Sequence, residues 1–145
     1  MKAVVQRVRQ TKLSVDGKLI SQIDGGLTVF LGVKSGDCEK QAEWIAKKIA
    51  NLRIFEDDNG KMNLSVKDVK GEVLLVSQFT LYGDASHGNR PSFTLAEEPP
   101  RANELYEYCA ENLRLMGVPV KQGVFGADMK IEQYNDGPVT IILEN

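Results

Sequence analysis

The chain has 145 residues, of which 42% are hydrophobic and 26% are charged. This composition is typical of one globular domain and excludes extensive disorder. The balance of 18 Lys and Arg residues against 20 Asp and Glu residues leaves a net charge of −2. That charge argues against a protein that coats nucleic acid, but not against one that contacts a single end of an RNA.

Histidine and cysteine are scarce in this chain. The single histidine, His87, excludes a multi-histidine metal site within one chain, and the two cysteines, Cys38 and Cys109, are too few for a disulfide framework. We therefore expect no metal, no cofactor and reduced thiols. No segment approaches the roughly 18 apolar residues of a membrane span, and the N-terminal apolar run is too short for a signal peptide. We expect a cytoplasmic protein that does not associate with membranes.

The first 35 residues are typical of β-strands, because valine and leucine recur between polar residues. Asp16-Gly17 fits a two-residue hairpin turn, and Asp24-Gly25-Gly26 marks a second turn. The nearly continuous apolar run over residues 27–33 predicts a strand that is buried on both faces.

A helix is expected next, with Asp37 as its N-cap and Cys38 in its first turn. Its apolar face follows spacings of three and four residues: Ala42, Ile45, Ile49 and Leu52. Residues 53–56 are expected as a short strand and residues 57–60 as a turn. Residues 72–79 are the strongest candidate for a central strand, and residues 83–92 are expected to form a polar loop.

A second helix is predicted to begin at Pro99-Pro100 and to end near Gly117. Its apolar stripe is Ala102, Leu105, Tyr106, Cys109, Leu113 and Met116. Strands are expected at 118–122, 129–135 and 139–143. Two helices and at least seven strands in the order β-α-β-α-β indicate a single α+β domain over residues 1–145.

Two segments carry polar residues that are unusual for a core. In Ser77-Gln78-Phe79-Thr80, an apolar strand runs into hydrogen-bonding side chains, which fits either a capped strand end or a binding pocket. Residues 135–140 include Gly137-Pro138, which fits a plain β-turn between two strands. A cis Gly-Pro bond would instead turn two carbonyl oxygens to one side, forming a rigid acceptor for an ammonium group. His87 could act as a base but lies in a glycine-rich loop, where an exposed residue without catalytic function is expected.

An ordered series of motifs resembles the D-aminoacyl-tRNA deacylase family over essentially the full chain. The matching segments are Met1–Val8, Asn51–Phe55, Lys61–Ser65, Ser77–Leu81, Arg90–Phe93, Phe125–Met129 and Asn135–Thr140. Gln133 departs from the pattern, since the family usually has an apolar residue there. The resemblance implies mostly antiparallel sheets that form a barrel-like core with two helices. It also implies a homodimer with active sites at the subunit interface, and tRNA as partner.

The same resemblance assigns roles to individual residues. Ser77, Gln78, Phe79 and Thr80 are implied to line the catalytic pocket. Gly137 and Pro138, joined by a cis bond and oriented by Arg7, are implied to hold the amino group of the substrate in the partner's site and to reject L-aminoacyl groups. The pocket for the terminal adenosine is implied to include Phe125 and Met129. Hydrolysis of mischarged glycyl-tRNA is also implied, because glycine has no side chain to reject.

Two catalytic routes follow for hydrolysis of the aminoacyl ester. Thr80 is one candidate nucleophile, but it would need an adjacent base, and the motif contains none. Backbone amides that stabilise the oxyanion, assisted by the substrate's ribose 2′-hydroxyl, are preferred because the ester is already activated. A cationic N-terminal segment and Arg90 are expected to face the acceptor stem. Alternatives are a non-catalytic dimeric ligand-binding or chromatin-associated module and a general small-ester hydrolase, the latter disfavoured because the sequence lacks a Ser/His/acid set.

Overall fold

The computed structural model describes residues 1–145 and contains eight strands, two helices and one short 3-10 turn. The strands are β1 (Lys2–Val15), β2 (Lys18–Ile23), β3 (Gly26–Gly32), β4 (Phe55–Glu56), β5 (Met62–Leu64), β6 (Glu72–Ser77), β7 (Val120–Gln122) and β8 (Lys130–Glu144). The helices are α1 (Glu39–Asn51) and α2 (Pro99–Leu115), and the 3-10 turn is η1 (Phe79–Tyr82). The α+β class expected from the sequence is confirmed.

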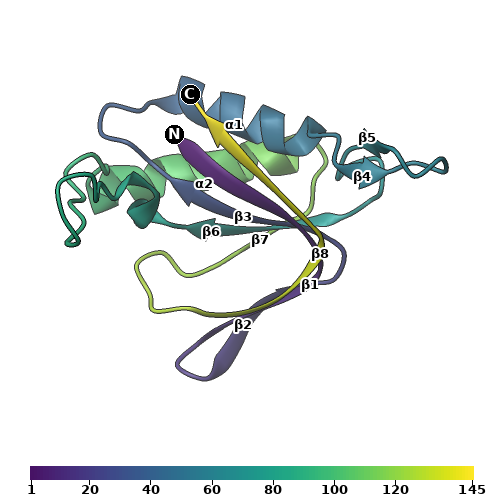
Figure 1. The fold of residues 1–145 in the computed structure, drawn as a ribbon, viewed down its shortest axis with the longest axis horizontal. Helices are drawn as coiled ribbons and strands as arrows, with labels where there is room; N and C mark the ends of the chain where they lie inside the picture. The colour runs from purple at the N-terminus through teal and green to yellow at the C-terminus, as the bar shows by residue number, and fades with distance from the viewer.

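The long strand β1 organises the sheet. One of its edges pairs antiparallel with β3 and then with β2, and the other edge pairs with β8 along almost its whole length. The order continues from β3 through β6 to β7, and these last two pairings are parallel. Parallel neighbours require long crossovers, which α1 and α2 supply on the same side of the sheet (Figure 1).

The sheet curls into a nearly closed barrel. The Ser21 hydroxyl donates to the Gln122 carbonyl at 2.7 Å, and the Lys121 ammonium donates to the Gln22 carbonyl at 2.6 Å, so β2 and β7 are joined across the opening. Alternate residues of β6 pack on opposite faces: Val73 and Leu75 belong to a large core beneath the helices, and Leu74 belongs to a smaller core inside the curl.

Several expected boundaries need correction. Asp37 is not the N-cap of α1: Cys38 holds that position, and its N–H donates to Gln41 Oε1 at 3.1 Å. Leu52 lies one residue beyond the helix, and the strand expected at 53–56 is reduced to Phe55–Glu56. The strand expected to reach residue 79 ends at Ser77, because the chain turns there into η1.

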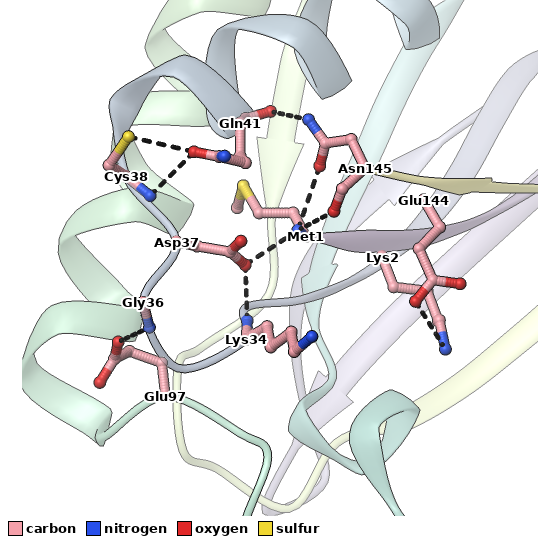
Figure 2. A network of polar contacts seen from close by, with 10 residues as sticks. All are labelled: Met1, Lys2, Lys34, Gly36, Asp37, Cys38, Gln41, Glu97, Glu144 and Asn145. Carbon is pink, nitrogen blue, oxygen red and sulfur yellow. Dashed lines mark hydrogen bonds and ion pairs between the residues drawn. The ribbon is translucent and has the colours of Figure 1, made fainter.

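Asp37 has a different role at the chain ends. Its carboxylate lies 2.9 Å from the Met1 ammonium and accepts from the Lys34 N–H at 2.7 Å (Figure 2). The same ammonium donates to the main-chain and side-chain oxygens of Asn145 at 3.2 and 3.1 Å. Met1 is fully buried, so these contacts tie the paired ends of β1 and β8 to the start of α1.

The largest correction concerns the C-terminal strands. The segments expected at 129–135 and 139–143 form the single strand β8, so residues 135–140 are not a plain turn between two strands. Gln6 pairs with Thr140 and Val8 pairs with Asn135, which leaves residues 136–139 opposite Arg7 alone. β8 therefore carries a bulge at residues 136–139, hereafter called the bulge.

Candidate active site

A cavity of about 580 Å³ lies where β6 ends. One wall comes from Ser77, Gln78 and Phe79, which leave β6 and enter η1. A second wall is the segment Phe125–Met129, and a third is the entry to α2 at residues 97–99. The structure thus brings five of the expected site residues together: Ser77, Gln78, Phe79, Phe125 and Met129.

The turn after β6 exposes main-chain donors beside this cavity. The Gln78 N–H still donates to the Leu31 carbonyl at 2.8 Å, as a continuation of the sheet. The first hydrogen bond of the turn runs from the Leu81 N–H to the Gln78 carbonyl at 3.3 Å, so the N–H groups of Phe79 and Thr80 precede it and have no acceptor within the turn. Residues before the first bond of such a turn are available to bind an anionic oxygen.

Aromatic side chains border the same turn. Phe79 is 54% exposed, and its ring meets the edge of Phe93 at a centroid distance of 5.1 Å. Tyr82 is buried on the inner side of the turn, and burial is the main cause that raises the pKa of its phenol above its ordinary value, with a further contribution from the carboxylates of Asp37 and Glu144. Tyr82 therefore stays protonated at neutral pH and does not provide a base.

Thr80 faces a second, smaller hollow of about 300 Å³. Its other lining residues are Val4, Gln6, Phe30, Gln78 and Leu81. Gln78 lines both spaces, and its Nε2 donates to Thr80 Oγ1. None of the residues that line the hollow is ionisable, so none can take a proton from the Thr80 hydroxyl.

The Gly137–Pro138 peptide bond is cis, as the family resemblance implied, whereas the residue pattern alone also fitted a plain turn. Arg7, only 6% exposed, holds the start of the bulge from within the protein. Its Nε donates to the Asp136 carbonyl at 3.2 Å and lies 3.3 Å from Asp136 Oδ2, while its Nη1 donates to the Ile54 carbonyl at 2.7 Å. A buried guanidinium that is anchored to Ile54 by one nitrogen and binds Asp136 with another gives the bulge a defined orientation.

The bulge and the cavity are separated within one chain. Arg7 pairs with Leu27 on β3, whereas Ser77 pairs with Leu31. Four residues along a strand correspond to about 13 Å. Gly137 and Pro138 are exposed and line neither hollow space, so the structure does not bring them, or Arg7, to Ser77–Thr80 of the same chain.

One candidate from the sequence lies away from the cavity, and several residues that line the cavity or the hollow were not predicted. His87 is exposed in the loop that follows η1 and lines neither space. Sequence reasoning missed Gln6, which lines the hollow beside Thr80, and Glu97, Glu98 and Asp128, which line the cavity. Only the outward position of Gln6 in the alternation of β1 could have suggested it.

Two further properties concern metals and membranes. No three or more His, Cys, Asp or Glu side chains are grouped so that they could hold a metal ion. Neither helix combines the length and the apolar character that crossing a bilayer would require.

The chain is thus a small α+β protein with a cavity at the end of a central strand and an outward bulge held by a buried arginine. The sequence matches the family described as D-Tyr-tRNA(Tyr) deacylase over residues 4–144, and the chain belongs to this family. The ordered motifs had predicted this membership, which is confirmed.

Individual relatives are similar to this chain over nearly their full lengths. The chain is 57% identical to the D-aminoacyl-tRNA deacylase of Geotalea daltonii, covering 99% of this chain and 96% of that protein. It is 54% identical to the D-aminoacyl-tRNA deacylase of Thermotoga petrophila, covering 100% and 97%. The solved structure of a c-Myc DNA unwinding element binding protein is similar, with a TM-score of 0.95, 46% identity and coverage of 100% and 99%. A probable eukaryotic D-amino acid tRNA deacylase shares the fold at 16% identity, with a TM-score of 0.83 and coverage of 98% and 97%.

Proposed function

We propose that this protein hydrolyses the ester bond of D-aminoacyl-tRNA and releases the free D-amino acid and tRNA, acting in the cytoplasm. The observation that carries the proposal is the separation of two elements in one chain: a cavity beside free main-chain donors, and a rigidly held bulge that faces outward. Each element is half of a site, and full-length membership of the deacylase family supports this reaction.

Catalysis is assigned to the main chain and to the substrate. The N–H groups of Phe79 and Thr80 are positioned to donate to the oxyanion as the ester carbonyl becomes tetrahedral, and a donor of this kind contributes about 3–4 kcal/mol. A water molecule adds to the ester carbon, the bond from that carbon to the ribose oxygen breaks, and the ribose oxygen leaves as a hydroxyl. The neighbouring 2′-hydroxyl of the terminal ribose assists by passing a proton from the water to the leaving oxygen. The lining of the hollow supports this route over a Thr80 nucleophile, because the Thr80 hydroxyl is bound by the Gln78 amide and no ionisable side chain lines the hollow.

The adenosine and the amino acid occupy different parts of the site. The terminal adenosine binds in the cavity near Phe125 and Met129, which offer an aromatic ring and a thioether to the base. The main-chain carbonyls of Gly137 and Pro138 hold the substrate ammonium and leave no room for an L side chain, so that chirality is decided by steric exclusion. Glycyl-tRNA is also hydrolysed, because glycine lacks a side chain to exclude.

The site is completed by a second copy of the chain. Because Gly137 and Pro138 lie about 13 Å along the sheet from the level of Ser77, they reach the catalytic turn of a partner rather than their own. An apolar outer patch made of Val4, Phe30, Leu81 and Ile142 adjoins Thr80, and Ile142 is 66% exposed. The second edge of β8 is unpaired, which further supports an interface on this face.

The dimer has a direct test. Sedimentation and light scattering should detect a dimer at assay concentrations, and specific activity should fall when dilution produces monomers. A monomer with full activity would disprove the shared site.

The reaction is tested by deacylation of matched D- and L-tyrosyl-tRNA. We expect fast release from the D substrate and release from the L substrate near the uncatalysed rate. Equal rates on both substrates would disprove chiral selection, and no hydrolysis of the D substrate would disprove the proposed activity.

A second candidate function is nucleic-acid binding without hydrolysis. It is favoured by the likeness to the structure described as a DNA unwinding element binding protein. The net charge of −2 argues against it, since binding to duplex DNA depends on neutralising phosphates. Retention of tRNA or DNA without deacylation would support this alternative.

A further inference from the structure

We propose that Gln133, acting through Gln6, is a positioning residue that sets the conformation of the bulge for catalysis; this inference rests on the proposed function. Gln133 lies on β8 two residues before Asn135, and Gln6 lies on β1 one residue before Arg7. Neither side chain is expected to contact the substrate's reacting atoms directly.

A chain of side-chain hydrogen bonds spans the bulge. The Nε2 group of Gln133 donates to Asn135 Oδ1 at 2.5 Å and to Gln6 Oε1 at 2.8 Å. Gln6 Nε2 donates in turn to Thr140 Oγ1 at 3.2 Å. We call these four residues the glutamine bridge. Asn135 immediately precedes the bulge and Thr140 immediately follows it, so the bridge joins the two ends of the segment that contains Gly137 and Pro138.

The bridge and Arg7 hold the bulge from opposite faces of the sheet. Arg7 points inward to the carbonyl of Ile54 and holds Asp136. Gln6, the neighbouring residue on β1, points to the other face, because side chains alternate along a strand. The bulge places four residues opposite the single residue Arg7, and a segment of this length can adopt many conformations. Arg7 fixes the start of the bulge and the glutamine bridge joins its two ends, so that one conformation is selected.

The bridge also reaches the catalytic turn. Gln6 lines the hollow that contains Thr80 and Gln78. A displacement of Gln6 would therefore change both the bulge and the wall of that hollow. Gln133 lines neither space, so its replacement should affect catalysis only through Gln6 and the bulge.

An unsatisfied polar atom of Gln133 argues against the view that this residue serves only to stabilise the fold. Its Oε1 atom is buried and has no hydrogen-bond partner. A buried acceptor without a donor costs free energy that an apolar side chain of equal length would not. Replacing Gln133 with methionine removes this unsatisfied atom and keeps the length of the side chain, but removes both donated hydrogen bonds.

The test compares wild type, Gln133→Met, Gln6→Met, the double variant and a control, Gln10→Met, in single-turnover hydrolysis of D-tyrosyl-tRNA. Gln10 lies on β1, as Gln6 does, and its side chain donates to Asp24, which is not part of the bridge. For Gln133→Met we expect a rate lower by about tenfold, an unchanged half-saturating enzyme concentration within about twofold, and an unchanged or higher Tm. The double variant should be no slower than the slower single variant, since both changes break one bridge.

Other outcomes would overturn the inference. A Gln133→Met protein with the wild-type rate would remove the positioning role while leaving the proposed function intact. A rate loss accompanied by a lower Tm, multiplicative losses in the double variant, or the same loss in Gln10→Met would also exclude it. A wild-type protein that does not hydrolyse D-tyrosyl-tRNA would disprove both the proposed function and this inference.

Discussion

The substitution Gly137→Ala tests the bulge most directly. Gly137 has a φ of +123°, a conformation that L side chains rarely adopt. An added Cβ would lie 2.9 Å from Val139 Cγ2, 3.0 Å from the Val139 nitrogen and 3.3 Å from Arg7 Nη2. Two of these atoms belong to Val139, within the bulge itself, and the third belongs to Arg7, which holds the bulge. The bulge must therefore shift away from Arg7 to make room for the Cβ.

The size of the effect follows from this geometry. Holding a residue in such a conformation costs about 1–3 kcal/mol. If the segment relaxes instead and the substrate loses the same amount of stabilisation in the transition state, the rate on D-tyrosyl-tRNA falls by about 5- to 150-fold. Hydrolysis of L-tyrosyl-tRNA should stay near the uncatalysed rate, because the pocket is disturbed and not mirrored.

The assay is single-turnover deacylation of both substrates, with circular dichroism and light scattering to check folding and dimer content. The matched control is Gly17→Ala, in the β1–β2 turn, where φ is +76° and an added Cβ meets no atom within 4 Å. This control carries backbone strain of the same kind at a site remote from the bulge, and it should keep wild-type activity. Undiminished D activity in a folded Gly137→Ala dimer, or an equal loss in the control, would show that the conformation of the bulge does not control hydrolysis.

Three further outcomes are expected. In single-turnover assays, Thr80→Ala should keep activity within about tenfold of wild type, whereas a 2′-deoxy terminal adenosine should slow release by more than about 100-fold. A larger loss from Thr80→Ala than from the 2′-deoxy substrate would instead indicate that Thr80 is the nucleophile. Burial raises the pKa of the Cys109 thiol to about 12, so a thiol reagent at pH 8 should modify only the half-buried Cys38 in the native protein, and fast labelling of both thiols would contradict this. Asp37→Ala leaves the buried Met1 ammonium without its carboxylate, which should destabilise the fold by about 3 kcal/mol and lower Tm by about 6–12 °C, and an unchanged thermal melt would argue against that anchor.

Local patterns were sufficient for much of the secondary structure. Asp16-Gly17 forms the expected turn with positive φ at both residues, and Pro99 begins α2 as expected. The buried positions Ala42, Ile45 and Ile49 follow the helical spacing read from the sequence. These features depend on interactions between residues a few positions apart, so the order of residue types is enough to predict them.

Features that depend on distant residues were missed. The N-cap expected at Asp37 moved to Cys38, because Asp37 instead binds the ammonium of Met1, a residue 36 positions away that is brought close by the pairing of β1 with β3. The two C-terminal strands merged into β8, because β1 is long enough to pair with both and leaves only Arg7 opposite the bulge. Strand register of this kind is set by the partner strand and not by the segment itself.

Residue patterns along the chain are enough to establish the α+β class, the two amphipathic helices and the ordered motifs that mark the family. The three-dimensional arrangement is needed to show that Ser77–Phe79 and Phe125–Met129 share one cavity, while Gly137 and Pro138 lie about 13 Å along the sheet from it. It also placed Gln6 and Gln133, which are 127 residues apart in the chain, in one bridge across the bulge. Side-chain periodicity is a local property, whereas the neighbours of a side chain across a curled sheet depend on strand pairing between segments at opposite ends of the chain.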